Sequence, residues 1–192
     1  MLRPIWLLSQ DTSQFCAPPL TTGALKASFL RYGRTTSMSD VELVHFFGEG
    51  EAARWLDERW RPELARRARA ALAAGLEPVV GLSCYTWNIA EFLEISRAVK
   101  TAVPEVLVVA GGPHVQRAED FLGSEPIDVV VLGEGEVTFT ELLDCESPAE
   151  WTDVKGLAGL EGVDGTSRVV RTAERPRTID LDRFPSALDV IE

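Results

Sequence analysis

Short apolar runs alternate with longer amphipathic stretches along most of this chain. The apolar runs are rich in Val, Ile, Leu and aromatic residues and occupy residues 5–8, 41–47, 79–83, 106–110 and 129–132. Their length and composition predict β-strands. Because several are apolar at nearly every position rather than at alternate ones, we expect strands that are buried on both faces, as in a parallel sheet.

The stretches between these runs have helical spacing. Helices are expected over residues 20–32, 51–74, 88–101, 117–122 and 137–143. In the first of them, Leu20, Ala24, Ala27 and Leu30 lie near one face. Pro62 lies inside the second and predicts a kink or break there. A strand–helix–strand order of this kind predicts parallel strands joined by right-handed crossovers.

The pattern changes after Cys145. Residues 157–160 and 168–171 flank an Asp164-Gly165 pair, which favours a β-hairpin, whereas residues 172–192 have no helical period. We therefore predict an α/β protein. Residues 1–146 would form a Rossmann-like five-stranded parallel sheet with flanking helices, and residues 147–192 a C-terminal β-hairpin and an extended linker that leaves the domain.

Composition excludes several partners. The net charge of −11 argues against nucleic acid, and the arginine-rich stretch 59–69 also contains acidic residues, as expected of a solvated helix face. No apolar run approaches the roughly 20 residues that span a bilayer, and the N-terminus does not resemble a secretory signal. Three widely separated cysteines do not predict a disulfide framework. We expect a cytoplasmic protein without a membrane partner.

Ligand contacts in such a sheet are expected in the loops at the carboxyl ends of the strands. Small, hydroxyl, amide, aromatic and acidic side chains gather there, as a large ligand with many polar groups would require. The candidate ligand-binding residues are Ser9, Gln10, Ser13, Ser83, Tyr85, Thr86, Trp87, Asn88, Gly111, Gly112, His114, Gly133, Glu134, Gly135 and Glu136.

Several of these residues also have a purely structural interpretation. Asn88 could cap a helix, Trp87 could pack on a neighbouring helix rather than on a flat ligand, and His114 is as readily a structural hydrogen-bonding group as a ligand contact. The Glu134 and Glu136 carboxylates could favour a helix N-terminus or accept hydrogen bonds from ligand amides. The glycines beside them do not form a dinucleotide fingerprint, because the third glycine is missing.

At these positions the chain resembles the N-terminal cobalamin-binding domain of cobalamin-dependent radical S-adenosylmethionine (SAM) enzymes, and the methyltransferases of that class in particular. The resemblance covers nearly the whole chain. The segments that carry it are Val80-Gly-Leu-Ser83, Val109-Ala-Gly-Gly-Pro-His114, Asp128-Val-Val-Val-Leu-Gly-Glu-Gly-Glu136 and Ile179-Asp-Leu-Asp-Arg-Phe-Pro185. The last of these is similar to the family's linker into the radical domain.

The resemblance implies that cobalamin is the cofactor, held as methylcobalamin for transfer of a methyl group to an unreactive carbon. It also implies a radical SAM domain as partner, on the same polypeptide, where SAM and a [4Fe–4S] cluster would bind. The family's Cys-x-x-x-Cys-x-x-Cys motif is not formed by Cys16, Cys84 and Cys145, so we expect a domain that is inactive alone. No metal ligand or catalytic residue is assigned.

Other cobalamin proteins place a histidine beneath the cobalt through Asp-x-His-x-x-Gly, which neither His45 nor His114 fits. The resemblance therefore implies a lower face without histidine, and Trp87 is the candidate for it. Two alternatives stay open: a cofactor-free docking domain of the same fold, and a flavodoxin-like domain. A flavodoxin-like domain needs a phosphate-binding loop after the first strand. The hydroxyl residues at 9–13 are weak support for such a loop.

Overall fold

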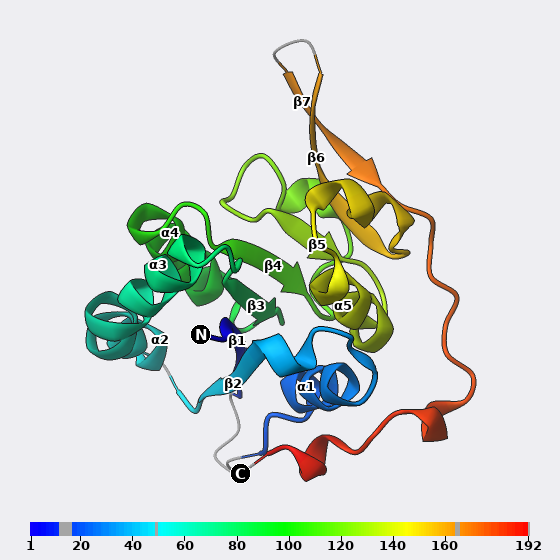
Figure 1. The fold of residues 1–192 in the computed structure, drawn as a ribbon, viewed down its shortest axis with the longest axis horizontal. Coiled ribbons are helices and arrows are strands. Elements are labelled where there is room, and N and C mark those ends of the chain that lie inside the picture. Colours follow the sequence, from blue (N-terminus) through cyan, green and yellow to red (C-terminus); the bar gives the residue numbers. More distant parts are fainter. Residues whose placement is uncertain (12–16, 49, 164–165, 192) are drawn as a thin grey trace.

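The computed structural model describes residues 1–11, 17–48, 50–163 and 166–191. Within them, one seven-stranded sheet has the order β2-β1-β3-β4-β5-β6-β7 (Figure 1). The strands are β1 (Arg3–Gln10), β2 (Ser39–Phe46), β3 (Val79–Ser83), β4 (Leu107–Gly111), β5 (Val129–Val131), β6 (Leu157–Val163) and β7 (Thr166–Arg171). The first five run parallel, as predicted, and the strand order reverses between β1 and β3.

Helices cover both faces of the sheet because successive strand residues point to opposite sides. Ile5 and Leu7 of β1 belong to the core beneath α1 (Leu20–Tyr32) and α5 (Gly135–Asp144), which lie against each other. Trp6 and Leu8 belong to the core on the other face. That face is covered by α2 (Glu51–Trp55), α3 (Ala65–Ala73) and α4 (Ile89–Ala102).

The helical stretch expected over residues 51–74 is irregular around Pro62, as predicted, although the chain stays helical through it. A π-helical stretch, Leu56–Leu64, joins α2 to α3 and contains the proline. The wider π-turn accommodates a residue that lacks a backbone N–H. Trp60 in this stretch is fully buried and packs edge-on against Trp6, with ring centroids 5.5 Å apart, so core packing holds the irregular turn in place.

Two other helical predictions need correction. The short helix expected over residues 117–122 is a single 3-10 turn, Ala118–Asp120. In α1, Leu20 and Leu30 are about half exposed, whereas Thr22, Gly23 and Phe29 are buried. The helix therefore packs through Phe29 and its small and hydroxyl residues, and of the expected stripe Ala27 is buried.

The predicted β-hairpin is present and extends the sheet, since β6 pairs antiparallel with β5 and β7 with β6. Its Asp164-Gly165 turn lies outside the described residues. A domain division at residue 146 stays a prediction. After β7 the chain is extended, as expected, apart from 3-10 turns at Leu181–Arg183 and Ala187–Asp189.

This C-terminal segment, residues 172–191, does not leave the body of the protein. It runs back past α5 and ends beside α1 (Figure 1). The Tyr32 hydroxyl donates to the carbonyl of Arg183, and a Cβ on Gly23 would lie only 2.8 Å from the Ile191 side chain. The segment thus becomes an outer layer over the α1/α5 face.

Candidate functional site

On the sheet face beneath α1 and α5, small residues lie at the carboxyl ends of the strands. Leu7, Gly81, Val109 and Val131 occupy this face in neighbouring strands. Two residues further along, on the same side, the chain places residues with small side chains or none, which are Ser9, Ser83, Gly111 and Gly133. Because these residues fill little space, the sheet and the helices separate toward the carboxyl ends of the strands.

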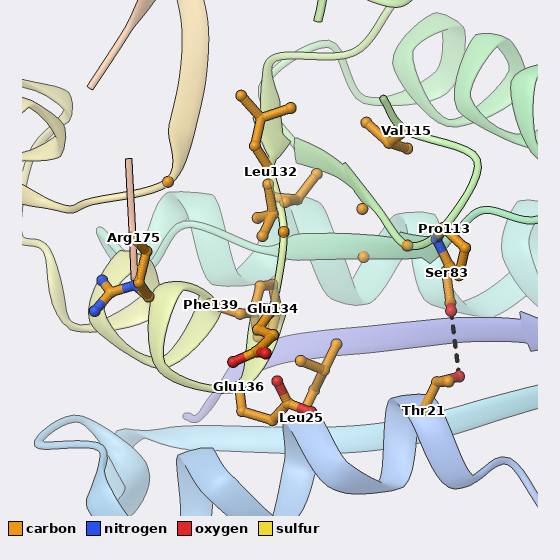
Figure 2. A pocket seen from close by; sticks show the side chains of 18 of the residues that line it. Thr21, Leu25, Ser83, Pro113, Val115, Leu132, Glu134, Glu136, Phe139 and Arg175 are labelled. Atoms are coloured by element: carbon orange, nitrogen blue, oxygen red, sulfur yellow. Dashed lines mark hydrogen bonds between the residues drawn. The ribbon is translucent and has the colours of Figure 1, made fainter. Parts of the chain in front are cut away.

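The resulting pocket has a volume of about 960 Å³. Its floor is the sheet face with Leu7, Gly81 and Val109, and its helical walls are Thr21, Thr22 and Leu25 of α1 and Gly135, Glu136 and Phe139 of α5. Figure 2 shows the Leu25 side chain on α1 and the Phe139 side chain on α5. It also shows the hydrogen bond between the Thr21 and Ser83 hydroxyls, which are 3.2 Å apart and join α1 to β3. The pocket borders the β1–β3 boundary, where strand order reverses and open α/β sheets bind ligands.

The C-terminal segment completes the pocket with a third wall, which includes Thr172, Glu174, Arg175 and Arg177. The Arg175 side chain, labelled in Figure 2, belongs to this wall. It fixes the wall by donating to Thr138 Oγ1 at 2.7 Å and by pairing with Glu141. Nothing in the sequence pattern signalled this wall, because its residues come from a stretch without secondary structure.

A tight contact between the β3 and β4 loops shapes the rim of the pocket. Gly112 has a φ of +104°, and a Cβ there would lie 2.8 Å from the carbonyl oxygen of Cys84 and 2.9 Å from its nitrogen. Hydrogen bonds hold both groups: Cys84 N–H donates to Gly111 O at 2.7 Å, and His114 N–H donates to Cys84 O at 3.1 Å. The rim therefore requires glycine at this position.

The β3–α4 loop presents an aromatic pair beside the pocket. Trp87 is 50% exposed, its Nε1 donates to the Gln10 carbonyl at 3.1 Å, and its ring stacks on Tyr85 with centroids 4.5 Å apart. Asn88 is fully buried and holds the loop, accepting from Tyr85 N–H at 2.8 Å and donating to Ser83 O at 3.0 Å. Trp87 is thus held by Tyr85 and the Gln10 carbonyl, and Asn88 points inward.

The two histidines both have protein partners and lie outside the pocket lining. His45 Nδ1 is 2.8 Å from Ser9 Oγ, and its Nε2 is 3.1 Å from the Ala17 carbonyl oxygen. Partial burial lowers the pKa of His45. The His114 ring packs edge-on against Phe121, and its Nδ1 lies 3.4 Å from Thr86 Oγ1.

Other candidates divide between the pocket and its surroundings. Ser9 is buried and also contacts Thr22, while Gln10 donates to Gly48 O and Glu91. Ser13 lies outside the described residues. The predicted residues that line the pocket are Ser83, Tyr85, Gly111, Gly112, Gly133, Glu134, Gly135 and Glu136. Those that do not are Ser9, Gln10, Thr86, Trp87, Asn88 and His114.

The Glu134 and Glu136 carboxylates make the lining acidic near the α5 N-terminus. Glu134 accepts from Thr178 N–H at 2.8 Å. Burial raises the pKa of the Cys84 thiol to about 12, so little thiolate, the nucleophilic form, is present at neutral pH. Across the described parts of the chain, no three His, Cys, Asp or Glu residues gather as metal ligands would, and no helix is long and apolar enough to cross a membrane.

Comparison with known proteins shows what this chain is similar to. Residues 53–143 match the family model of the B12 binding domain. The predicted resemblance to the cobalamin-binding domains of radical SAM methyltransferases is therefore confirmed. The matched range contains β3, β4, β5 and most of α5, and hence most of the rim loops described above.

Two curated relatives are methyltransferases. The chain is 46% identical over 115 residues to the 2-(S-pantetheinyl)-carbapenam-3-carboxylate methyltransferase of Streptantibioticus cattleyicolor, a match that covers 57% of this chain and 17% of the relative. It is 42% identical over 110 residues to the cobalamin-dependent radical SAM methyltransferase TokK of Streptomyces tokunonensis, which covers 55% and 16%. The chain thus matches less than a fifth of either relative's length.

A solved structure shares the fold. The cobalamin-dependent SAM radical enzyme OxsB, determined with aqua-cobalamin bound, superposes with a TM-score of 0.56 at 18% identity. The superposition covers 91% of this chain and 23% of that one. Because it spans nearly all of this chain, it supports the Rossmann-like architecture well beyond the segment that the family model matches.

Proposed function

We propose that the pocket and its rim bind cobalamin and present it for methyl transfer. The observation that carries the proposal is a cavity of about 960 Å³ at the reversal of strand order, in a chain whose rim loops match the B12 binding domain. Ligand pockets usually measure about 300–1,000 Å³, so this cavity suits a large ligand. In the proposed full-length protein, an unreactive carbon would receive the methyl group.

The pocket chemistry fits cobalamin's nucleotide tail. A flat aromatic base needs an apolar slot with a few hydrogen-bonding groups. Leu7, Leu25 and Phe139 supply the apolar surfaces, and the Thr21 and Ser83 hydroxyls lie near the mouth. The glycines of the rim leave the backbone open to the edge of the corrin ring.

We further propose that no imidazole lies beneath the cobalt and that methylcobalamin is the working form. Both histidines are engaged with other protein groups and neither lines the pocket. Trp87 is the candidate for the lower face, since its ring is half exposed and oriented by the Gln10 carbonyl and Tyr85. When bound, methylcobalamin supplies the methyl group, while these residues bind and orient it.

The rest of the proposed enzyme lies in other parts of the polypeptide. A radical SAM domain would hold SAM and a [4Fe–4S] cluster. Cys84 is buried within the β3–α4 loop and Cys145 lies at the end of α5, so neither is placed to bind such a cluster. We expect the 192-residue chain to bind the cofactor without catalysing methyl transfer.

Blocking the pocket tests the proposal. Leu25→Trp places an indole in the slot between α1 and the sheet, whereas Leu30→Trp adds the same indole at a 47% exposed position of the same helix. After incubation with excess cobalamin and desalting, wild type and Leu30→Trp should keep the corrinoid absorption. Leu25→Trp should lose at least tenfold in affinity, because a bulky side chain excludes the tail.

The same measurement separates the alternatives. A cofactor-free docking domain would lose all corrinoid colour on desalting, including in the wild type. This hypothesis receives no support from the pocket, which side chains leave open. For a flavodoxin-like domain, a phosphate would have to bind after β1, where the Ser9 hydroxyl already contacts Thr22 and His45.

A further inference from the structure

Among the residues that the structure describes, one arginine of the pocket wall has no partner for its charge. The pocket is lined by Arg171, Arg175 and Arg177. Arg171 is paired with Glu119, and Arg175 with Glu141. Among the described residues, the guanidinium of Arg177 forms no hydrogen bond or ion pair.

The backbone around Arg177 is held on both sides. Two residues earlier, the Arg175 side chain is fastened to α5 and to the Lys155 carbonyl, at 3.2 Å from the latter. One residue later, Thr178 N–H donates to Glu134, directly before α5. Pro176 between these anchors restricts the backbone further. The backbone at Arg177 is thus held at the pocket wall near the start of α5, and its side chain is exposed to solvent.

The pocket lining holds three arginines and three glutamates, but two of the arginines are already paired with Glu119 and Glu141, which lie outside the lining. Glu134, Glu136 and Glu174 line the same pocket, in a chain with a net charge of −11. An anionic group entering this pocket would be repelled unless a cation met it. The nucleotide tail of cobalamin carries one such group, a phosphodiester between the corrin side chain and the ribose. Arginine is well suited to phosphate because its planar guanidinium can donate two parallel hydrogen bonds.

We propose that Arg177 binds the phosphodiester of the cofactor's nucleotide tail and so selects corrinoids that carry a complete tail. This inference rests on the proposed cobalamin function. It makes the C-terminal segment a binding element of the site, in addition to a cover over α1 and α5.

The test compares cobalamin with cobinamide, a corrinoid that lacks the phosphodiester, ribose and base. Dissociation constants for both are measured by absorption titration with the 192-residue chain at low ionic strength. Arg177→Gln should weaken cobalamin binding about tenfold, the usual scale for losing a charge-assisted hydrogen bond. It should change cobinamide binding less than twofold. Arg177→Lys should retain part of the preference, because it keeps the charge but not the planar donors.

Arg66→Gln is the matched control. Arg66 is exposed on α3, over the opposite face of the sheet, and its replacement changes the net charge equally. It should leave both dissociation constants unchanged. The assignment of Arg177 would be overturned if Arg177→Gln weakened the binding of both corrinoids equally, or of neither. Either result would leave the proposed cobalamin-binding function of the chain standing. A wild-type chain that binds neither corrinoid would instead overturn the proposed function.

Discussion

Replacing Gly112 by alanine should destabilise the protein more than replacing Gly75 or Gly48 by alanine. The backbone at Gly112 has a φ of +104°, and the new Cβ would meet the Cys84 carbonyl oxygen at 2.8 Å. Both Cys84 backbone polar groups are already hydrogen bonded within the rim, so they cannot easily move away. The conformation costs about 1–2 kcal/mol and forced overpacking adds about 1–3 kcal/mol.

We therefore expect a loss of about 3 kcal/mol in the free energy of unfolding. For a chain of this size, each kcal/mol corresponds to roughly 2–4 °C, so the midpoint should fall by about 6–12 °C. Urea titration followed by circular dichroism would give the free energy, with the slope m checked for constancy.

Two further glycine replacements separate the cost of the backbone conformation from the cost of the close contact. Gly75 has a φ of +75° with nothing within 4 Å of a built Cβ, so Gly75→Ala should cost only the conformational part, about 1 kcal/mol. Gly48 has open space and no positive φ, so Gly48→Ala should stay within about 0.5 kcal/mol of wild type. If Gly112→Ala were no worse than Gly75→Ala, the close approach of the two rim loops would be refuted.

Two other predictions concern the loops around the pocket. Trp87→His should bring an imidazole toward the cobalt and shift the cob(II)alamin absorption and electron paramagnetic resonance spectra. If neither Trp87→His nor Trp87→Ala altered the spectrum or the affinity, Trp87 would not form the lower face. Burial lowers the folded-state pKa of His45 below its usual 6.5, so the unfolded chain takes up the proton first and stability should fall as the pH drops through that value. His45→Gln should flatten this dependence, and an unchanged slope in urea titrations at pH 5.5–8 would assign it to another group.

The sequence was sufficient for the parallel sheet, because apolar runs at β1, β3, β4 and β5 can be buried only between two layers of helices. It also located the glycine and serine residues where those strands end. Strand ends in a parallel sheet share one edge, so local pattern alone placed Ser83, Gly111 and Gly133 together. The resemblance to cobalamin-binding domains rested on these same residues.

Only the tertiary structure decided which side chains face the pocket. Asn88 and Trp87 are neighbours in the sequence, yet one is fully buried and the other half exposed, because the fold of a polar loop depends on what it packs against. The path of residues 172–191 could not be predicted from the sequence pattern either. That segment has no hydrophobic period, and its position depends on contacts with residues distant in the sequence, such as Arg175 with Glu141 and Thr178 with Glu134. Long-range contacts of this kind leave no periodic signal in the chain, so the third wall of the pocket and Arg177 within it emerge only once the chain is folded.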